Sequence, residues 1–273
     1  MAFCTEVLGE VLEVFPSHFV HLGGDECPRT EWRADPAVQR RMSSLGLADE
    51  DALQAWFTGQ VNDLLRSAGR QMVAWDEVLE AGPVPEDTVV MAWRHAEWGR
   101  VAAETGLGTI ICPEAPCYFD HYQSDDPAEP LAIHGLNTLE DVYAFDPVPA
   151  GAPAEAFDRV LGTQLLLWTE YMPTPQHVEY MAFPRAAALA EVAWSAGMGE
   201  FGEFRSRLTA HIGRLDALSV NYRPLDGPRA WQRGGSGPWK AHFGPNGRPI
   251  THEHPSPRPA AGAGGGARLT TER

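Results

Sequence analysis

Short apolar runs alternate with longer segments of helical periodicity along most of the chain. Residues 6–15 and 49–68 each place their apolar side chains on one helical face, which predicts two amphipathic helices. A shorter helix is predicted near residues 98–104, and two long ones over roughly 175–195 and 201–219. The remaining apolar runs are short and predict strands at residues 18–22, 71–75, 88–93, 109–112 and 162–168.

These strands are apolar on both faces and mostly alternate with helices. That pattern is typical of an α/β protein in which helices cover a parallel sheet. The helical faces predict core positions, among them Trp56 on the second helix. Residues 121–160 are Pro-rich and predicted to be irregular. Residues 235–273 are rich in Gly, Pro, Arg and Ala and predict a low-complexity disordered tail, which leaves residues 1–234 as the folded domain.

Composition narrows the possible functions. The 273 residues are 44% hydrophobic and 21% charged, which is ordinary globular usage, and the net charge is −16. Binding to nucleic acid needs a basic face, so the charge argues against it. No apolar run has the roughly 18–20 residues that span a bilayer, so no membrane association is predicted. The first 15 residues carry Glu6, Glu10 and Glu13 and no basic leader, so they do not predict a signal peptide. The localisation therefore stays open.

Carboxylates and aromatic side chains follow the ends of the predicted strands. In parallel α/β barrels the carboxyl ends of the strands meet at one rim, where active sites are built. Aromatic rings stack on the apolar faces of a neutral sugar, and carboxylates accept hydrogen bonds from its hydroxyls. The candidates are Asp25, Glu26, Trp75, Trp93, Tyr118, Asp120, Trp168 and Glu170.

Asp25 and Glu26 carry the sharpest signal, because they follow Gly23-Gly24 directly. Adjacent carboxylates on extended backbone leave in different directions and so address different atoms of one ligand. Their repulsion and an aromatic wall around them would keep one carboxyl protonated as a general acid. The alternative interpretation makes either residue the cap of a following helix.

Three further residues are predicted to have structural roles. Asp76 and Glu77 follow a candidate pocket Trp but are predicted to serve a loop or a helix cap. Arg185 lies within a predicted helix and is expected to form a structural ion pair.

No metal or other cofactor is predicted. His21 points inward on its strand and is expected to be a buried, hydrogen-bonded histidine, since no companion ligand motif accompanies it. His252 and His254 form an HxH pair in the tail, without a third ligand nearby.

Taken in order, seven segments resemble glycoside hydrolase family 20, the β-N-acetylhexosaminidases. The resemblance covers roughly residues 3–230. The segments are HLGGDECP (21–28), VAWDE (73–77), MAWR (91–94), YFDHYQ (118–123), LLLWTEY (165–171), FPRAAALAEVAWS (183–195) and NYRP (221–224).

The resemblance implies a retaining mechanism in which the substrate's own acetamido group is the nucleophile. The resemblance implies that Glu26 protonates the leaving oxygen and then activates water, while Asp25 accepts the acetamido N–H. Tyr118 hydrogen-bonds the acetamido oxygen, with Asp120 close by, and Glu170 holds the outer hydroxyls. The acetamido pocket is walled by Trp75, Trp93 and Trp168.

The resemblance also implies a partial (β/α)8 TIM barrel, of which this chain supplies about strands 4–8. The expected partners are oligosaccharides ending in N-acetylglucosamine or N-acetylgalactosamine. Open sheet edges predict self-association, and lost contacts to the sugar predict impaired activity of the isolated chain. The rival interpretation is a catalytically silent carbohydrate-binding or interaction module. A metal-dependent hydrolase is disfavoured, because His21, Asp25 and Glu26 lack a further ligand.

Overall fold

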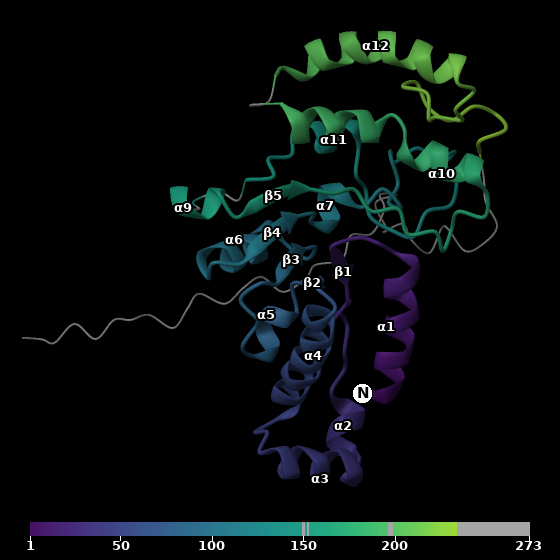
Figure 1. Cartoon of the computed structure of the whole chain (residues 1–273). Helices are drawn as coiled ribbons and strands as arrows, with labels where there is room; N and C mark the ends of the chain where they lie inside the picture. The colour runs from purple at the N-terminus through teal and green to yellow at the C-terminus, as the bar shows by residue number, and fades with distance from the viewer. Residues whose placement is uncertain (149–150, 152, 196–198, 234–273) are drawn as a thin grey trace, which may run out of the picture.

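Five parallel strands form one open sheet in the computed structural model, which describes residues 1–148, 151, 153–195 and 199–233. The strand order follows the chain, so each strand pairs with its predecessor (Figure 1). This arrangement confirms the predicted partial α/β barrel with its strands in sequence. The predicted tail at residues 235–273, with His252 and His254, lies outside the described residues. The strands are β1 Phe19–His21, β2 Gln71–Trp75, β3 Val89–Ala92, β4 Gly108–Ile111 and β5 Val160–Thr163.

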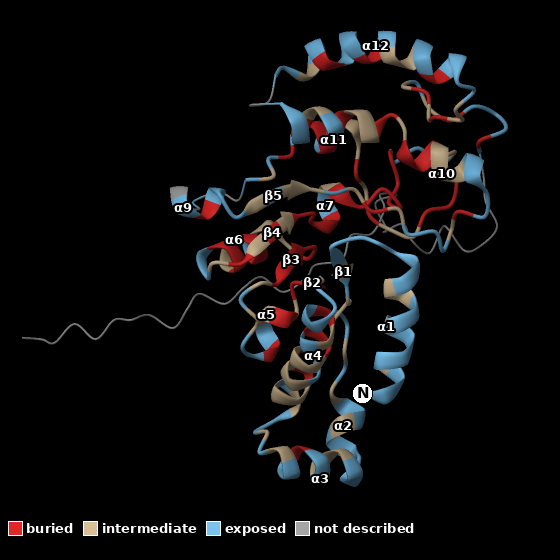
Figure 2. Ribbon diagram, in the orientation of Figure 1, coloured by how far each residue is buried: buried red, intermediate tan, exposed pale blue. Residues whose placement is uncertain are grey.

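The core lies at the middle of the sheet, and the two edges are more exposed (Figure 2). Every residue of β3 is buried, as are the last four residues of β2. On the edge strands, by contrast, Phe19 of β1 is 48% exposed and Leu161 of β5 is 57% exposed. The register is regular except for an irregularity between Thr109 and Ile110, where β4 pairs with β5.

Helices pack against the strands and against one another. α4 contacts β2 and α6 contacts β3 and β4, while α11 packs against α8. Among the described residues, no helix combines the length and apolarity needed to cross a membrane. The helices are α1 Ala2–Val14, α2 Thr30–Ala34, α3 Pro36–Leu45, α4 Glu50–Ser67, α5 Val78–Ala81, α6 Ala96–Glu104, α7 Glu114–Cys117, α8 Leu139–Tyr143, α9 Ala154–Phe157, α10 Pro175–Ala182, α11 Arg185–Trp194 and α12 Phe201–Ala217.

Two element predictions need correction. The strand expected at 162–168 is β5 at Val160–Thr163, and only the bridge between Leu166 and Tyr118 extends the pairing. The helix expected at 175–195 is two helices, α10 and α11, separated at Phe183 and Pro184. Proline has no N–H for the helical hydrogen bond and clashes with the preceding turn, which explains the break.

The predicted core face of α4 is partly wrong. The helix turns Gln54, Thr58 and Asn62 inward and leaves Phe57 39% exposed. Trp56 is half-buried beneath the Arg41 guanidinium, 5.7 Å from the ring centroid, and is not a core residue. The reason is a polar contact, because Gln54 Nε2 donates to the turn that follows β1 and so fixes the rotation of the helix.

Candidate active site

All eight predicted site residues line one cavity of about 540 Å³ at the carboxyl ends of the strands. Asp25 and Glu26 follow β1, whereas Trp75 ends β2 and Trp93 follows β3. Tyr118 and Asp120 come from the segment after β4, and Trp168 and Glu170 from the segment after β5. The convergence follows from the parallel sheet, which brings these ends to one rim.

A glycine turn directs the backbone from β1 into the cavity. Gly23 and Gly24 have φ of +83° and +99°, a region that only glycine adopts without strain. Trp75 N–H donates to the Gly23 carbonyl at 3.0 Å, and Gln54 Nε2 donates to the Gly24 carbonyl at 2.8 Å. The next turn puts Glu26 at φ +45°, a strained value of the kind that concentrates at functional sites.

Asp25 and Glu26 are both exposed, so the expected desolvating wall around them is absent within the described residues. They are not helix caps either, because α2 begins at Thr30. His21 is exposed rather than buried, and its Nδ1 accepts the Gly23 N–H at 3.0 Å while its ring lies 4.5 Å from Trp75. The exposure of Asp25, Glu26 and His21 has one cause, since β1 is an edge strand.

The aromatic side chains form a continuous wall on the other side of the cavity. Trp75 lies 6.5 Å from Trp93 and 6.3 Å from Trp168 between ring centroids. Trp93 stacks against Tyr118 at 6.1 Å. Trp75, Trp93 and Tyr118 are buried, whereas Trp168 at the β5 end is 43% exposed. The wall is therefore fixed near the middle strands and open toward the edge.

Asp76 and Glu77 hold Trp93, rather than capping α5 as predicted. Asp76 is completely buried, and its Oδ2 accepts the backbone N–H groups of Trp93 at 2.8 Å and Arg94 at 3.1 Å. Its Oδ1 pairs with the Arg94 guanidinium. Glu77 Oε2 accepts the indole N–H of Trp93 at 2.9 Å. Burial raises the pKa of Asp76 to about 6, against the opposing effect of Arg94. Both residues lie in the turn between β2 and α5, as the loop alternative predicts, and the helix-cap alternative is wrong because α5 has no side-chain cap.

Asp120 lies at the base of the cavity and is buried. Burial raises its pKa from 3.8 to about 7, although Arg185 and His134 favour the carboxylate. Its Oδ1 has no hydrogen-bond partner among the described residues. Burial also raises the pKa of the Tyr118 hydroxyl, which therefore remains a proton donor at neutral pH.

Arg185 fixes the segment that carries Asp120, and it does so without the predicted ion pair. Within the described residues, no carboxylate comes within ion-pair distance of this fully buried guanidinium. Instead it donates to four main-chain carbonyl oxygens and lies over the Phe119 ring at 4.6 Å. The carbonyls belong to Phe119, His121, Asn137 and Met181. Burial lowers the pKa of Arg185 to about 9, so it stays charged at neutral pH.

Three further polar side chains line the cavity and were not predicted from the sequence. Glu114, His121 and His134 lie beside Tyr118 and Asp120. Glu114 directly follows Pro113 after β4, a strand-end position that was a usable signal. His134 comes from a stretch expected to be irregular, and no spacing rule connects it with Glu114.

Comparisons with known proteins agree with this geometry. Residues 1–197 match the family model described as glycosyl hydrolase family 20, catalytic domain. A β-hexosaminidase of Porphyromonas gingivalis is 41% identical over 236 residues, and one of Vibrio furnissii is 35% identical over 188. The crystal structure of a family 20 exo-β-N-acetylglucosaminidase from Vibrio harveyi, in complex with N-acetylglucosamine, superimposes with a TM-score of 0.76 at 34% identity.

The matched region is most of this chain but a smaller share of each relative. It includes 86% of this chain but 30% of the Porphyromonas protein, and 82% of this chain but 35% of the Vibrio harveyi structure. The chain thus spans about a third of the length of these relatives. The family model matches residues 1–197, which are most of the chain. The chain therefore belongs to glycosyl hydrolase family 20.

Proposed function

We propose that this chain carries the acid and the acetamido pocket of a β-N-acetylhexosaminidase, which releases terminal N-acetylhexosamine with retention of configuration. One observation carries the proposal: eight residues selected from five strand ends line a single cavity. Further support comes from the relatives, whose names describe β-hexosaminidases and an exo-β-N-acetylglucosaminidase bound to N-acetylglucosamine.

Glu26 acts as the general acid and then as the base. It protonates the leaving glycosidic oxygen, and it later takes a proton from the water that opens the oxazolinium ion. The strained backbone at φ +45° sets the direction of this side chain at the rim. Its exposure gives water direct access for the second step.

Asp25 and Tyr118 orient the acetamido group, which is the nucleophile. Asp25 accepts the acetamido N–H, and the Tyr118 hydroxyl donates to the carbonyl oxygen. The rings of Trp75, Trp93 and Trp168 enclose the group and hold its oxygen at attack distance from the anomeric carbon. Glu170, which is exposed, accepts hydrogen bonds from the sugar's outer hydroxyls.

The test compares Glu26→Gln with the unchanged chain on two substrates. For a chitin disaccharide, whose leaving group needs a proton, we expect kcat/KM to fall by about 10²- to 10⁴-fold. For a nitrophenyl N-acetylglucosaminide, whose leaving group is already acidic, the loss should be much smaller. Glu31→Gln changes an exposed carboxyl outside the cavity and is the matched control. An equal loss on both substrates would reject Glu26 as the acid.

Three further measurements separate the rival functions. Hydrolysis of a nitrophenyl glucoside at a comparable rate would exclude assistance by the acetamido group, and turnover abolished by a chelator would favour a metal-dependent hydrolase. Because three tryptophans line the cavity, N-acetylglucosamine binding should change their fluorescence. Binding without any turnover would favour the silent carbohydrate-binding module.

A further inference from the structure

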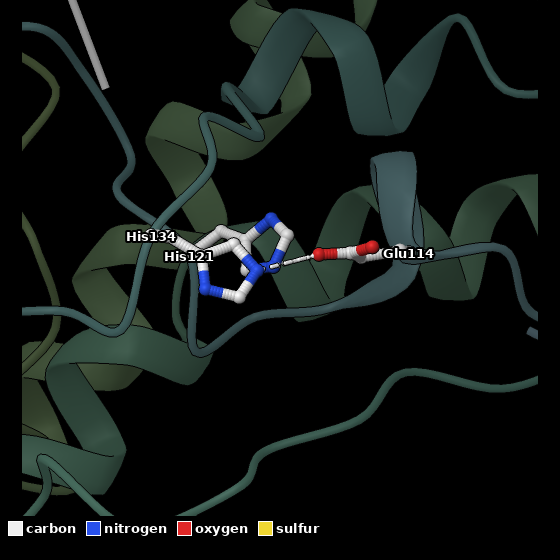
Figure 3. A group of neighbouring side chains, drawn as sticks. All are labelled: Glu114, His121 and His134. Carbon is white, nitrogen blue, oxygen red and sulfur yellow. Dashed lines mark hydrogen bonds and ion pairs between the residues drawn. The ribbon is translucent and has the colours of Figure 1, made fainter. Parts of the chain in front are cut away.

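Glu114, His121 and His134 bring three ligand atoms together at the wall of the candidate active site. Their ligand atoms all lie within 4.8 Å of one another. Glu114 Oε1 is 2.7 Å from His134 Nε2 and 3.1 Å from His121 Nε2. Figure 3 shows both imidazole rings turning a nitrogen toward the same carboxylate.

The group is held from several directions, so its geometry does not depend on an exposed loop alone. The backbone N–H of Glu114 donates to the Trp93 carbonyl at 2.7 Å. Asn137 Nδ2 donates to the Glu114 and Tyr118 carbonyls, both at 2.8 Å. The carbonyl of His121 accepts from Arg185.

The three ligand atoms of the group suit a cation. His121 is 3% exposed, and its Nε2 has no well-directed hydrogen bond in the described part of the chain. Two imidazoles and one carboxylate are a donor set typical of zinc and its neighbours.

We propose that Glu114, His121 and His134 bind a divalent transition metal of the Zn²⁺ class. Zinc bonds of about 2.0–2.1 Å place the ligand atoms of a tetrahedral site about 3.3 Å apart. The observed separations of 2.7 and 3.1 Å open to that value by a few tenths of an ångström. All three side chains line the cavity, so water can reach a metal bound there.

The second nitrogen of His121 limits the affinity. When Nε2 binds metal, Nδ1 carries the proton, and Nδ1 faces Asn137 Nδ2 at 3.2 Å. That nitrogen cannot accept a hydrogen bond, and its two hydrogens already serve main-chain carbonyls. A ligand histidine without an outer acceptor costs about 10- to 100-fold in affinity. We therefore expect a dissociation constant on the order of micromolar.

The test titrates the chelator-treated full chain with Zn²⁺ by calorimetry and with Co²⁺ by visible absorption. We expect one metal per chain and a loss of affinity of about 100-fold or more in His134→Ala, whose half-buried side chain makes it the mildest of the three changes. His177→Ala removes another half-buried histidine, outside the group, and should bind as the unchanged chain does. In the unchanged chain, Zn²⁺ should protect His134 from acylation by diethylpyrocarbonate, which needs no variant.

Several results would overturn the proposal. One is undiminished binding in His134→Ala with a native circular dichroism spectrum. Another is binding that disappears in His252→Ala/His254→Ala, which would assign the metal to that pair. A thiolate-to-cobalt charge-transfer band would assign it to the free cysteines. Absence of binding up to on the order of 1 mM would reject the site altogether.

Discussion

Asp120→Asn should change how the stability of the protein depends on pH. Asp120 is 4% exposed, and burial raises its pKa from 3.8 to about 7. A carboxyl whose pKa is higher in the folded state takes up a proton on folding. The free energy of unfolding should therefore fall as pH rises from about 4 to about 7. Asparagine cannot ionise and removes this contribution.

The magnitude follows from the two pKa values. The interval from 3.8 to about 7 corresponds to about 4 kcal/mol, at 1.36 kcal/mol for each pH unit. Against this stands the buried amide of the new asparagine. Asp120 Oδ1 has no partner among the described residues, so an unpaired amide group costs about 1–3 kcal/mol. The variant should gain about 1–3 kcal/mol at pH 8 and lose a similar amount at pH 4.

The assay is urea denaturation followed by tryptophan fluorescence between pH 4 and pH 8. The informative quantity is the difference between Asp120→Asn and the unchanged chain, because the other titrating groups cancel in it. Asp125→Asn, at an exposed position five residues away, is the control and should keep the parent slope. Parallel pH profiles for Asp120→Asn and the unchanged chain would show that Asp120 is ionised throughout, and the reasoning from burial would fail.

Two further predictions concern the support of the wall and the sheet edges. Asp76→Asn keeps the shape of the side chain but leaves the buried Arg94 guanidinium without its main counter-charge, so urea denaturation should show a loss of about 3 kcal/mol. Unchanged stability would mean that Glu80 alone satisfies Arg94. The isolated chain should self-associate through its exposed strand edges, and Phe19→Lys with Leu161→Lys should shift its sedimentation toward the monomer. Leu218→Lys, just after α12, should leave the sedimentation unchanged. If Leu218→Lys shifted the sedimentation as much as the two edge substitutions, the cause would be general solubility and not the strand edges.

The site was predictable because the sequence states where each strand ends. Trp75 and Trp93 each stand beside a fully apolar run, and a parallel sheet brings such ends to one rim. The helix at Pro36–Leu45 could also have been predicted from the sequence, because Val38, Met42 and Leu45 stand at helical spacing. Asp35 accepts from Ala37 N–H at 2.7 Å, and Gly46 ends the helix at φ +68°, both of which are readable capping signals.

The contacts that support the site were not predictable from the sequence. They join residues far apart in the chain, and several of them use main-chain carbonyl groups, which every residue has. Arg185 donates to the carbonyl of Phe119, 66 residues earlier, and any carbonyl would look the same in the sequence. Asp76 was misassigned for a related reason. A carboxylate after a strand suits a cap as well as an ion pair, and the choice was decided by Arg94, 18 residues further on.

The distribution of burial across the cavity divides the two halves of the proposed chemistry. Trp75, Trp93 and Tyr118 are buried, so on this side of the proposed acetamido pocket a hydrogen bond from Tyr118 acts in a medium that excludes water. Asp25 and Glu26 are exposed to solvent beside the edge strand β1, where water screens their interactions with other charges. In the proposed chemistry, the ring contacts to the acetamido group depend on the buried side, whereas the Asp25 hydrogen bond to the acetamido N–H and protonation of the leaving oxygen by Glu26 depend on the exposed side. N-acetylglucosamine binding by the chain should therefore be easier to detect than its turnover.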